Sequence, residues 1–311
     1  MRVFLAGASG AIGRSLVPRL VAAGHAVTGT TRSQRRAEAI RAAGATPAVV
    51  DALDPPALRS AVERAAPEVI VHELTALPDR YDPRKSGLYD ATNRIRTEGT
   101  RNLLDAARAT GARRFVCQSI AFAYAPGPQP EVKDEDAPLN FDAPPPFTEG
   151  VRVIDEMERA VLDAEGLEAL VLRYGWFYGP GTHYGEEGSL AQDVRKRRLP
   201  VIGSGAGLFS FIHVDDAADA TVAAVERGAP GIYNVVDDEP AAMRDWLPLY
   251  AEAIGARRPR RVPVWLARLA AGKMAAAVNV QPGASNAKAK RELGWEPRWR
   301  SWREGFREAP R

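Results

Sequence analysis

Apolar runs alternate with amphipathic stretches along the first half of the chain. Short runs rich in β-branched and apolar residues predict strands, and segments with apolar residues at helical spacing predict helices. The predicted strands are residues 1–6, 26–30, 47–50, 68–72, 113–118 and 168–173, and the predicted helices are 15–23, 34–43, a helix from 55, 87–110 and 148–165. This alternation is typical of an α/β protein with a doubly wound parallel sheet, which binds ligands at the carboxyl ends of its strands.

The pattern changes after Arg173. Residues 174–181 are aromatic and glycine-rich, and the remainder predicts helices near 188–198, 216–227, 243–255, 262–277 and 287–293, with short strands at 208–212 and 231–236. We therefore expect a first domain over 1–173 and a smaller substrate domain over 174–311, packed together and partly interleaved. The proline-rich stretch 125–147 has no clear period, so it is predicted to be a long loop at the ligand edge and a candidate lid.

Three glycines join the first strand to the first helix. In Gly7-Ala-Ser9-Gly10-Ala11-Ile12-Gly13, Gly7 permits a tight turn, Gly10 allows a diphosphate to approach the backbone, and Gly13 allows the helix to pack closely. Free backbone N–H groups at a helix N-terminus attract phosphate. The turn, with Ser9, Ala11 and Ile12, is therefore the predicted dinucleotide site, the alternative being a glycine-rich turn without a ligand.

The end of the second strand bears on the choice between NADP and NAD. An Asp or Glu at this place would bind the free ribose hydroxyls, whereas the chain has Thr31 and Arg32. A guanidinium is a charge-assisted partner for a 2′-phosphate, so we predict NADP over NAD. The alternative is that the arginines here are a solvated start to the second helix. Asp51 is expected at the adenine, with Ala52, Leu74 and Ser119 as further cofactor contacts.

Composition sets further bounds. The chain has 311 residues, 45% hydrophobic and 26% charged, with a net charge of +3 from scattered basic residues, so a nucleic-acid partner is not predicted. Cys117 is the single cysteine, which is typical of a reducing compartment and excludes an internal disulfide. With four histidines there is no metal-binding spacing. No signal peptide or long apolar run is seen, so we expect a soluble, cytoplasmic protein with no membrane partner.

Several motifs together resemble a known superfamily. They are Gly7-x-x-Gly10-x-x-Gly13, Asp51, Gly99-Thr100-x-Asn102, the stretch Ser119 to Tyr124, Leu172-Arg173 with Tyr178-Gly-Pro180, Phe211-Ile-His-Val-Asp-Asp216, Tyr233-Asn234-Val235, and Leu293-Gly-Trp-x-Pro297. In order and spacing the chain resembles the extended short-chain dehydrogenase/reductase superfamily, of the NAD(P)-dependent epimerase/dehydratase type. The resemblance implies a Rossmann domain, a small C-terminal substrate domain, a small-molecule substrate, and a homodimer formed through helices 87–110 and 148–165.

The same resemblance shows where this chain departs from the superfamily. The catalytic Tyr-x-x-x-Lys pair is absent from the helix after the fifth strand, with Gly150 at the tyrosine position and Ile154 at the lysine position. A helix asparagine is replaced by Arg96, with Asn93 one turn upstream. The usual His-Leu-Ala-Ala segment is His72-Glu-Leu-Thr75. These departures argue against the superfamily's ordinary proton transfer.

Three side chains remain as candidate catalytic residues. Ser119 could orient a carbonyl or hydroxyl group, or be a turn hydroxyl bound to backbone. Tyr124 could replace the missing acid. Glu73, if desolvated, would have a raised pKa and act as acid or base, its alternative role being a hydrogen bond to the ribose. His213 is expected to be structural, with Asp215 as the N-cap of the helix that follows.

Two functions remain in view from the sequence. The first is an NAD(P)-dependent oxidoreductase or isomerase that acts on a hydroxylated or carbonyl small molecule, with a nucleotide-linked sugar as one candidate, through a non-standard proton donor. The second is a protein that binds and senses NADP(H) without turnover, which the missing Tyr-Lys pair would suit. We favour the enzyme, because the cofactor turn is intact and the C-terminal region is complete.

Overall fold

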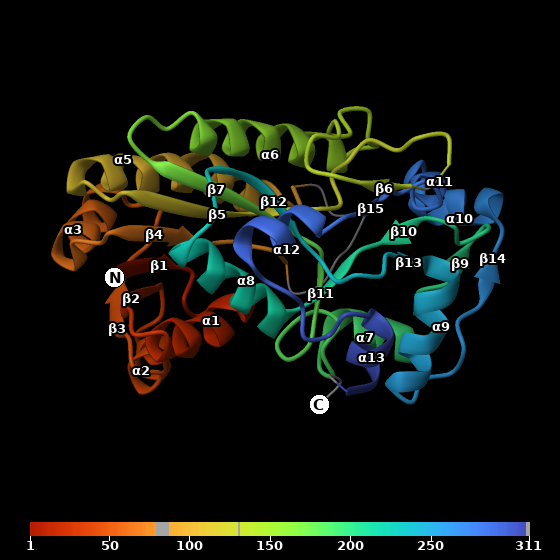
Figure 1. Cartoon of the computed structure of the whole chain (residues 1–311). Coiled ribbons are helices and arrows are strands. Elements are labelled where there is room, and N and C mark those ends of the chain that lie inside the picture. The colour runs from red at the N-terminus through yellow and green to blue at the C-terminus, as the bar shows by residue number, and fades with distance from the viewer. Residues whose placement is uncertain (79–86, 130, 309–311) are drawn as a thin grey trace.

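A seven-stranded parallel sheet forms the centre of the computed structural model, which describes residues 1–78, 87–129 and 131–308 (Figure 1). Its strands run in the order β12-β7-β5-β4-β1-β2-β3. Their bounds are β1 Arg2–Ala6, β2 Ala26–Thr31, β3 Thr46–Val49, β4 Val69–His72, β5 Arg114–Ile120, β7 Glu168–Tyr174 and β12 Gly231–Val235. The chain moves outward from β1 in both directions, which creates a crevice at the carboxyl ends of the strands next to β1.

Helices cover both faces of the sheet, as strands that are apolar on both sides require. Along β1, Val3 and Leu5 pack into one core with helices α1, α8 and α12, whereas Phe4 and Ala6 pack into a second core with α3, α5 and α6. The helices are α1 Ala11–Ala22, α2 Gln34–Ala42, α3 Pro55–Ala65, α5 Thr100–Thr110, α6 Phe147–Leu162, α8 Val214–Glu226 and α12 Ala287–Leu293. The predicted doubly wound, Rossmann-type sheet is confirmed.

The predicted long helix over 87–110 is not uniform. It consists of α4, Asp90–Arg94, then one π-helical turn, η1, Ile95–Gly99, and then α5. A π-turn inserts an extra residue into an α-helix and is frequently found at functional sites. The inserted turn carries Arg96.

The rest of the chain builds a smaller unit with an aromatic core. Trp246, Trp302, Tyr184, Phe211 and Phe306 are among its buried members. Its elements, together with the loop strand β6, are β6 Val132–Lys133, β8 Trp176–Tyr178, α7 Ser189–Arg195, β9 Val201–Ile202, β10 Leu208–Phe209, β11 Phe211–His213, β13 Ala241–Ala242, α9 Met243–Ala253, β14 Arg261–Val262, α10 Val264–Ala271, α11 Met274–Ala277, β15 Gly283–Ala284 and α13 Trp302–Glu308.

Two elements of this unit differ from the sequence prediction. The predicted strand 208–212 is two strands, because β10 pairs with β13 and β11 pairs with β8. The predicted helix 262–277 ends at Gly272, whose φ of 53° is left-handed and closes α10 before α11 begins.

The two predicted domains share their elements. Strand β12 and helix α8 lie beyond residue 173, yet β12 pairs with β7 in the main sheet and α8 packs on α1. The loop 125–147 is fastened to the C-terminal part through β6, which pairs with β15, and through the Glu135 carboxylate, which accepts from Asn234 N at 2.8 Å. The boundary at 173 stays a prediction.

Within the described residues, no helix is both long enough and apolar enough to cross a membrane.

Candidate functional site

The turn between β1 and α1 is shaped for a diphosphate. Gly7 has a φ of 105°, and a Cβ built on Gly13 would lie 2.3 Å from the Gly7 carbonyl oxygen, so the turn and the helix can touch only because both residues are glycine. Gly10 is exposed and caps α1 without a side chain. The N–H groups of Ala11, Ile12 and Gly13 have no partner within the helix, since they belong to its first turn. Together they form an uncapped anion site beside Ser9.

The predicted adenosine contacts lie along the next two strand ends. Thr31 ends β2 and is buried, with its Oγ1 accepting from Ser33 N at 3.2 Å, while the Arg32 side chain is exposed beside it. Asp51 follows β3, and its carboxylate accepts from Leu53 N at 3.0 Å. The Ala52 carbonyl accepts from Asn102 Nδ2 at 2.8 Å, which fixes this corner to α5.

His72 fixes the chain where it leaves β4. Its Nδ1 accepts from Leu74 N at 3.2 Å, so Nε2 carries the proton and donates to Thr100 Oγ1 at 3.0 Å. Burial, with the nearby charge of Arg96, lowers the pKa of His72 to about 4, so the ring is neutral. The Leu74 carbonyl in turn accepts from Gln118 Nε2 at 3.2 Å. This segment is therefore held rigidly next to the glycine turn.

Glu73 is buried on the opposite face of the sheet from His72. Its Oε1 accepts from the Tyr174 hydroxyl at 2.9 Å, and that hydroxyl lies 2.7 Å from Thr221 Oγ1 of α8. Its Oε2 is buried with no hydrogen-bond partner among the described residues. Burial raises the pKa of Glu73 to about 8, so the carboxyl is neutral at pH 7. The side chain faces α8 and not α6.

Ser119 and Tyr124 belong to one buried network. Ser119 Oγ donates to Glu158 Oε1 at 2.6 Å, and Arg173 pairs with both oxygens of Glu158 at 2.9 and 2.5 Å. The Tyr124 hydroxyl accepts from Arg173 Nη1 at 2.9 Å and donates to Asn234 Oδ1 at 2.7 Å. Burial raises the pKa of Tyr124 to about 12. The hydroxyl protons of both residues are therefore engaged within the network.

The positions of the missing pair lie on the inward face of α6. Gly150, Ile154 and Glu158 are spaced four residues apart and so share one stripe of the helix. Ile154 is buried, whereas no described atom lies within 4 Å of a Cβ built on Gly150. The structure therefore leaves open space where the phenol would be and has no lysine amine one turn further on.

An aromatic stack, Phe147-Phe122-Trp176, stands at the same edge. Phe122 follows β5 and Trp176 begins β8, and their rings are stacked with centroids 3.9 Å apart. Phe147, at the start of α6 and three residues before Gly150, lies 6.4 Å from Phe122. All three side chains are partly exposed, so the stack offers a surface to a flat ring. The sequence did not predict this stack, because Phe122 lies four residues beyond the predicted strand 113–118, although Trp176 belongs to the aromatic stretch 174–181.

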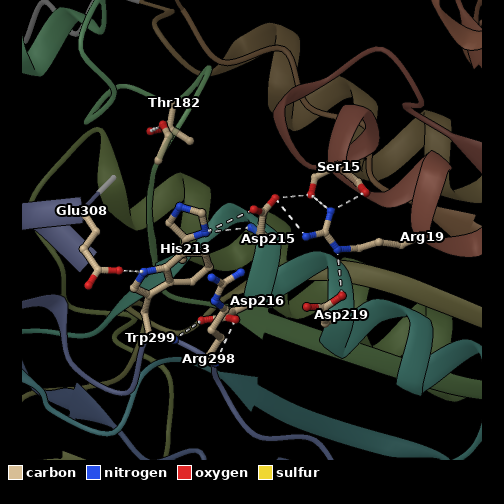
Figure 2. Close-up of polar contacts among 11 residues, drawn as sticks. Ser15, Arg19, Thr182, His213, Asp215, Asp216, Asp219, Arg298, Trp299 and Glu308 are labelled. Carbon is tan, nitrogen blue, oxygen red and sulfur yellow. Dashed lines mark hydrogen bonds and ion pairs between the residues drawn. The ribbon is translucent and has the colours of Figure 1, made fainter. Parts of the chain in front are cut away.

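Polar contacts between α1 and α8 fasten the cofactor helix to the C-terminal part (Figure 2). Arg19 Nε pairs with Asp219 at 2.7 Å, and Ser15 Oγ donates to Asp215 Oδ1 at 2.5 Å. The N-cap of α8 is His213, whose Nδ1 accepts from Asp215 N at 3.1 Å. The predicted N-cap at Asp215 was therefore wrong, because that carboxylate is turned toward α1 instead. The structural role expected of His213 holds.

No group of three or more His, Cys, Asp or Glu side chains that could hold a metal occurs in the part of the chain that the structure describes.

The fold and the glycine turn define a dinucleotide-binding protein of the Rossmann type. The chain belongs to the NAD dependent epimerase/dehydratase family, whose model matches residues 3–235. The resemblance expected from the motifs is confirmed, and membership supports an NAD(P)-dependent function of the oxidoreductase type.

Curated relatives and solved structures agree with this assignment. The chain is 50% identical over 310 residues, 98% of its length and 99% of the relative's, to a 3-diazoavenalumate denitrifying reductase from a Streptomyces species. It is similar in fold to the UDP-glucose 4-epimerase of Thermus thermophilus in complex with NAD, at a TM-score of 0.75 and 24% identity, covering 100% and 98% of the two chains. It is also similar in fold to the human epimerase family protein SDR39U1 with NADPH. The TM-score is 0.73 at 21% identity, and the match covers 100% of this chain and 99% of the human chain.

Proposed function

We propose that this protein is an NAD(P)H-dependent reductase that replaces the diazo group of an aromatic diazo carboxylate with hydrogen. The denitrifying reductase that is 50% identical over nearly the whole of both chains supports the reaction class. The aromatic stack Phe147-Phe122-Trp176 supports a flat aromatic substrate.

The observation that carries the proposal is the lack of a proton relay at the α6 edge. Reduction of a carbonyl needs a hydride and a separate proton, which a Tyr-Lys pair would supply. Here Gly150 and Ile154 occupy those positions, Ser119 and Tyr124 donate within their own network, and Glu73 faces α8. No side chain at the described α6 edge is therefore placed to protonate a substrate.

Removal of a diazo group has no such requirement. The overall reaction is Ar–N₂⁺ + NAD(P)H → Ar–H + N₂ + NAD(P)⁺. The C–N bond breaks and its electron pair leaves with N₂, while the transferred hydride brings the electron pair of the new C–H bond. No net proton is consumed. The reduced nicotinamide supplies both the electrons and the hydrogen. The residues that remain at the edge would then only bind and orient the reactants.

The chain's own residues would act in three places. The glycine turn holds the diphosphate, and Arg32, which has no carboxylate beside it at the end of β2, favours NADP over NAD. Phe122 and Trp176 pack against the substrate ring. By excluding water they would also protect a diazonium group from hydrolysis, a side reaction that dry sites suppress.

The test is turnover of 4-carboxybenzenediazonium by the purified protein. We expect benzoate and N₂ to form with oxidation of NADPH, faster than in a protein-free control and without proton uptake in weakly buffered solution. No benzoate above that control would sink the proposal. Binding of NADPH with no turnover of any substrate would instead favour the sensor.

A second candidate function is carbonyl reduction with Glu73 as the proton donor, which its neutral carboxyl and unpartnered Oε2 favour. In that case a 3-oxo acid would be reduced with uptake of one proton for each NADPH, and Glu73→Gln would abolish the reduction. The proton balance therefore separates the two candidates.

A further inference from the structure

Arg96 is a buried guanidinium with no hydrogen-bond or ion-pair partner for its Nε among the described residues. The residue lies on the π-turn η1 and is 6% exposed. Its Nε is fully buried with no hydrogen bond, and within the described residues the guanidinium forms no ion pair either. Burial lowers the pKa of Arg96 to about 10, so the group is charged at pH 7. A buried charge left in this state is costly, and strongly perturbed buried groups cluster at functional sites.

The charged groups that the structure describes around Arg96 leave it uncompensated. The side chains nearest to it electrostatically are Cys117, Tyr89, Glu158 and His72. Both oxygens of Glu158 already bind Arg173, and Oε1 also accepts from Ser119. His72 is neutral, and burial raises the pKa of the Cys117 thiol, so neither adds negative charge. Two guanidiniums therefore share one carboxylate, and the cluster has an excess positive charge.

A second unsatisfied group lies one turn before Arg96. Asn93 is buried, and its Oδ1 has no hydrogen-bond partner. Both side chains are buried and lie about one helical turn apart across the junction of α4 and η1, so we place the amide and the guanidinium in one region. Rotation of the amide about its Cβ–Cγ bond would present Nδ2 there as a donor. A guanidinium and an amide together match the two oxygens of a carboxylate.

This region borders the open part of the site. The turn η1 packs against α6, whose inward stripe carries Gly150, Ile154 and Glu158. Glu158 is an electrostatic neighbour of Arg96, and two turns along the same stripe Gly150 faces open space. A ligand that enters at Gly150 and extends along this stripe toward Glu158 would therefore approach Arg96.

We propose that Arg96, with Asn93, binds the carboxylate of the substrate and selects anionic over neutral compounds. The identity of that carboxylate rests on the proposed function, but the anion site itself does not. Arg96 would be a specificity-determining residue supplied by a π-turn that the helical pattern did not predict.

The experiment measures binding without turnover, so failure of diazo reduction leaves it intact. Calorimetry at pH 7 with protein saturated with NADP⁺ compares cinnamate with its neutral match, methyl cinnamate. We expect wild type to bind cinnamate at least about tenfold more tightly than the ester, as for a charge-assisted pair in a desolvated site. Arg96→Gln should lose this preference, and Arg96→Lys should keep part of it.

Arg94→Gln is the matched control, because Arg94 lies on the same helix but is exposed and pairs with Glu98 at 3.0 Å. It should keep the preference in full. Arg96→Met tests stability: if the unliganded charge is a cost, its melting temperature equals or exceeds that of wild type. The proposal is overturned if Arg96→Gln weakens acid and ester equally, if it weakens NADP⁺ binding instead, or if Arg96→Met melts well below wild type.

Discussion

Glu73 occupies a buried position where an ionised carboxylate would be destabilising. The side chain is buried against Tyr174 and Thr221, and one of its oxygens has no partner in the described structure. The structure accommodates it by keeping it neutral, because desolvation penalises the charged form. The sequence predicted that a desolvated Glu73 would have a raised pKa, since it follows a buried strand. It could not predict that the side chain turns toward α8, because that depends on how β4, β5 and β7 pair and where α8 packs.

Glu73 should make stability fall with rising pH. The folded-state pKa of about 8 lies above 4.5, the usual value for a glutamate, so between these values the folded state holds a proton that the unfolded state has released. Stability from this group is full below about pH 4.5 and declines until about pH 8. Glu73→Gln should remove this decline. The stability of the variant minus that of wild type should therefore be greater at pH 8 than at pH 5 by roughly 2 kcal/mol or more, since one pKa unit is worth about 1.4 kcal/mol.

Urea denaturation of both proteins at several pH values measures the effect. Parallel pH profiles for wild type and Glu73→Gln would contradict it.

Arg32 should set the cofactor preference. It is the exposed residue after β2, where no carboxylate is present to bind a ribose diol. Arg32→Asp should weaken NADPH by about tenfold or more, the usual value of a charge-assisted contact, and leave NADH unchanged or improved. Fluorescence titration with both cofactors measures this. Arg35→Asp, on the neighbouring helix α2, is the control; an equal loss of NADPH and NADH in Arg32→Asp would rule the preference out.

At the level of single elements, the helix after β1 and the helix over 87–110 differ in how far the sequence predicts them. The glycine spacing predicts the turn into α1. The structure confirms the steric reason at Gly7 and Gly13, where an added Cβ would lie within 3 Å of backbone atoms. The π-turn at Ile95–Gly99 has no such signature, since its residues continue an ordinary helical pattern. The direction of the Arg96 side chain depends on this π-turn, so it could not be predicted from the sequence.

Gly13→Ala should damage the cofactor turn. The added methyl would lie 2.3 Å from the Gly7 oxygen and 2.6 Å from the Ala8 carbonyl carbon, so turn and helix must separate. Overpacking of this kind costs about 1–3 kcal/mol, and displaced N–H groups should lower NADPH affinity by at least about tenfold. Calorimetry and urea denaturation measure the two effects. Gly150→Ala is the matched control for stability, because its methyl meets no atom and alanine favours a helix. Equal stability of both variants would refute the steric argument.

Across the whole molecule, the sequence predicted the strands more reliably than their partners. The run at 231–236 was recognised as a strand, but its place beside β7 was not, since alternation along the chain does not say which distant strand returns to the sheet. The same holds for the pairing of Glu158 with Arg173, which joins α6 to β7. The local sequence pattern predicts where helices and strands lie, whereas the pairing of distant strands and side chains is seen only in the folded structure.

A fragment ending at residue 173 should not fold by itself. It would lack β12, α8 and α12, leaving the edge of β7 unpaired and the apolar face around Leu170 and Leu172 uncovered. We expect no cooperative thermal unfolding of 1–173 by circular dichroism, in contrast to the full chain. Co-expression with 174–311 should restore a soluble complex. A cooperative transition in the isolated fragment would mean that the first domain is autonomous.

The return of β12 also orders events during synthesis. Because this strand and the helices that flank it leave the ribosome after most of the sheet has emerged, β7 spends that interval as an open template for other chains. Slower elongation between residues 175 and 235 would lengthen this exposure, whereas faster elongation over the same segment would shorten it. Recoding this segment for slow or for fast translation should therefore change the yield of native protein in opposite directions.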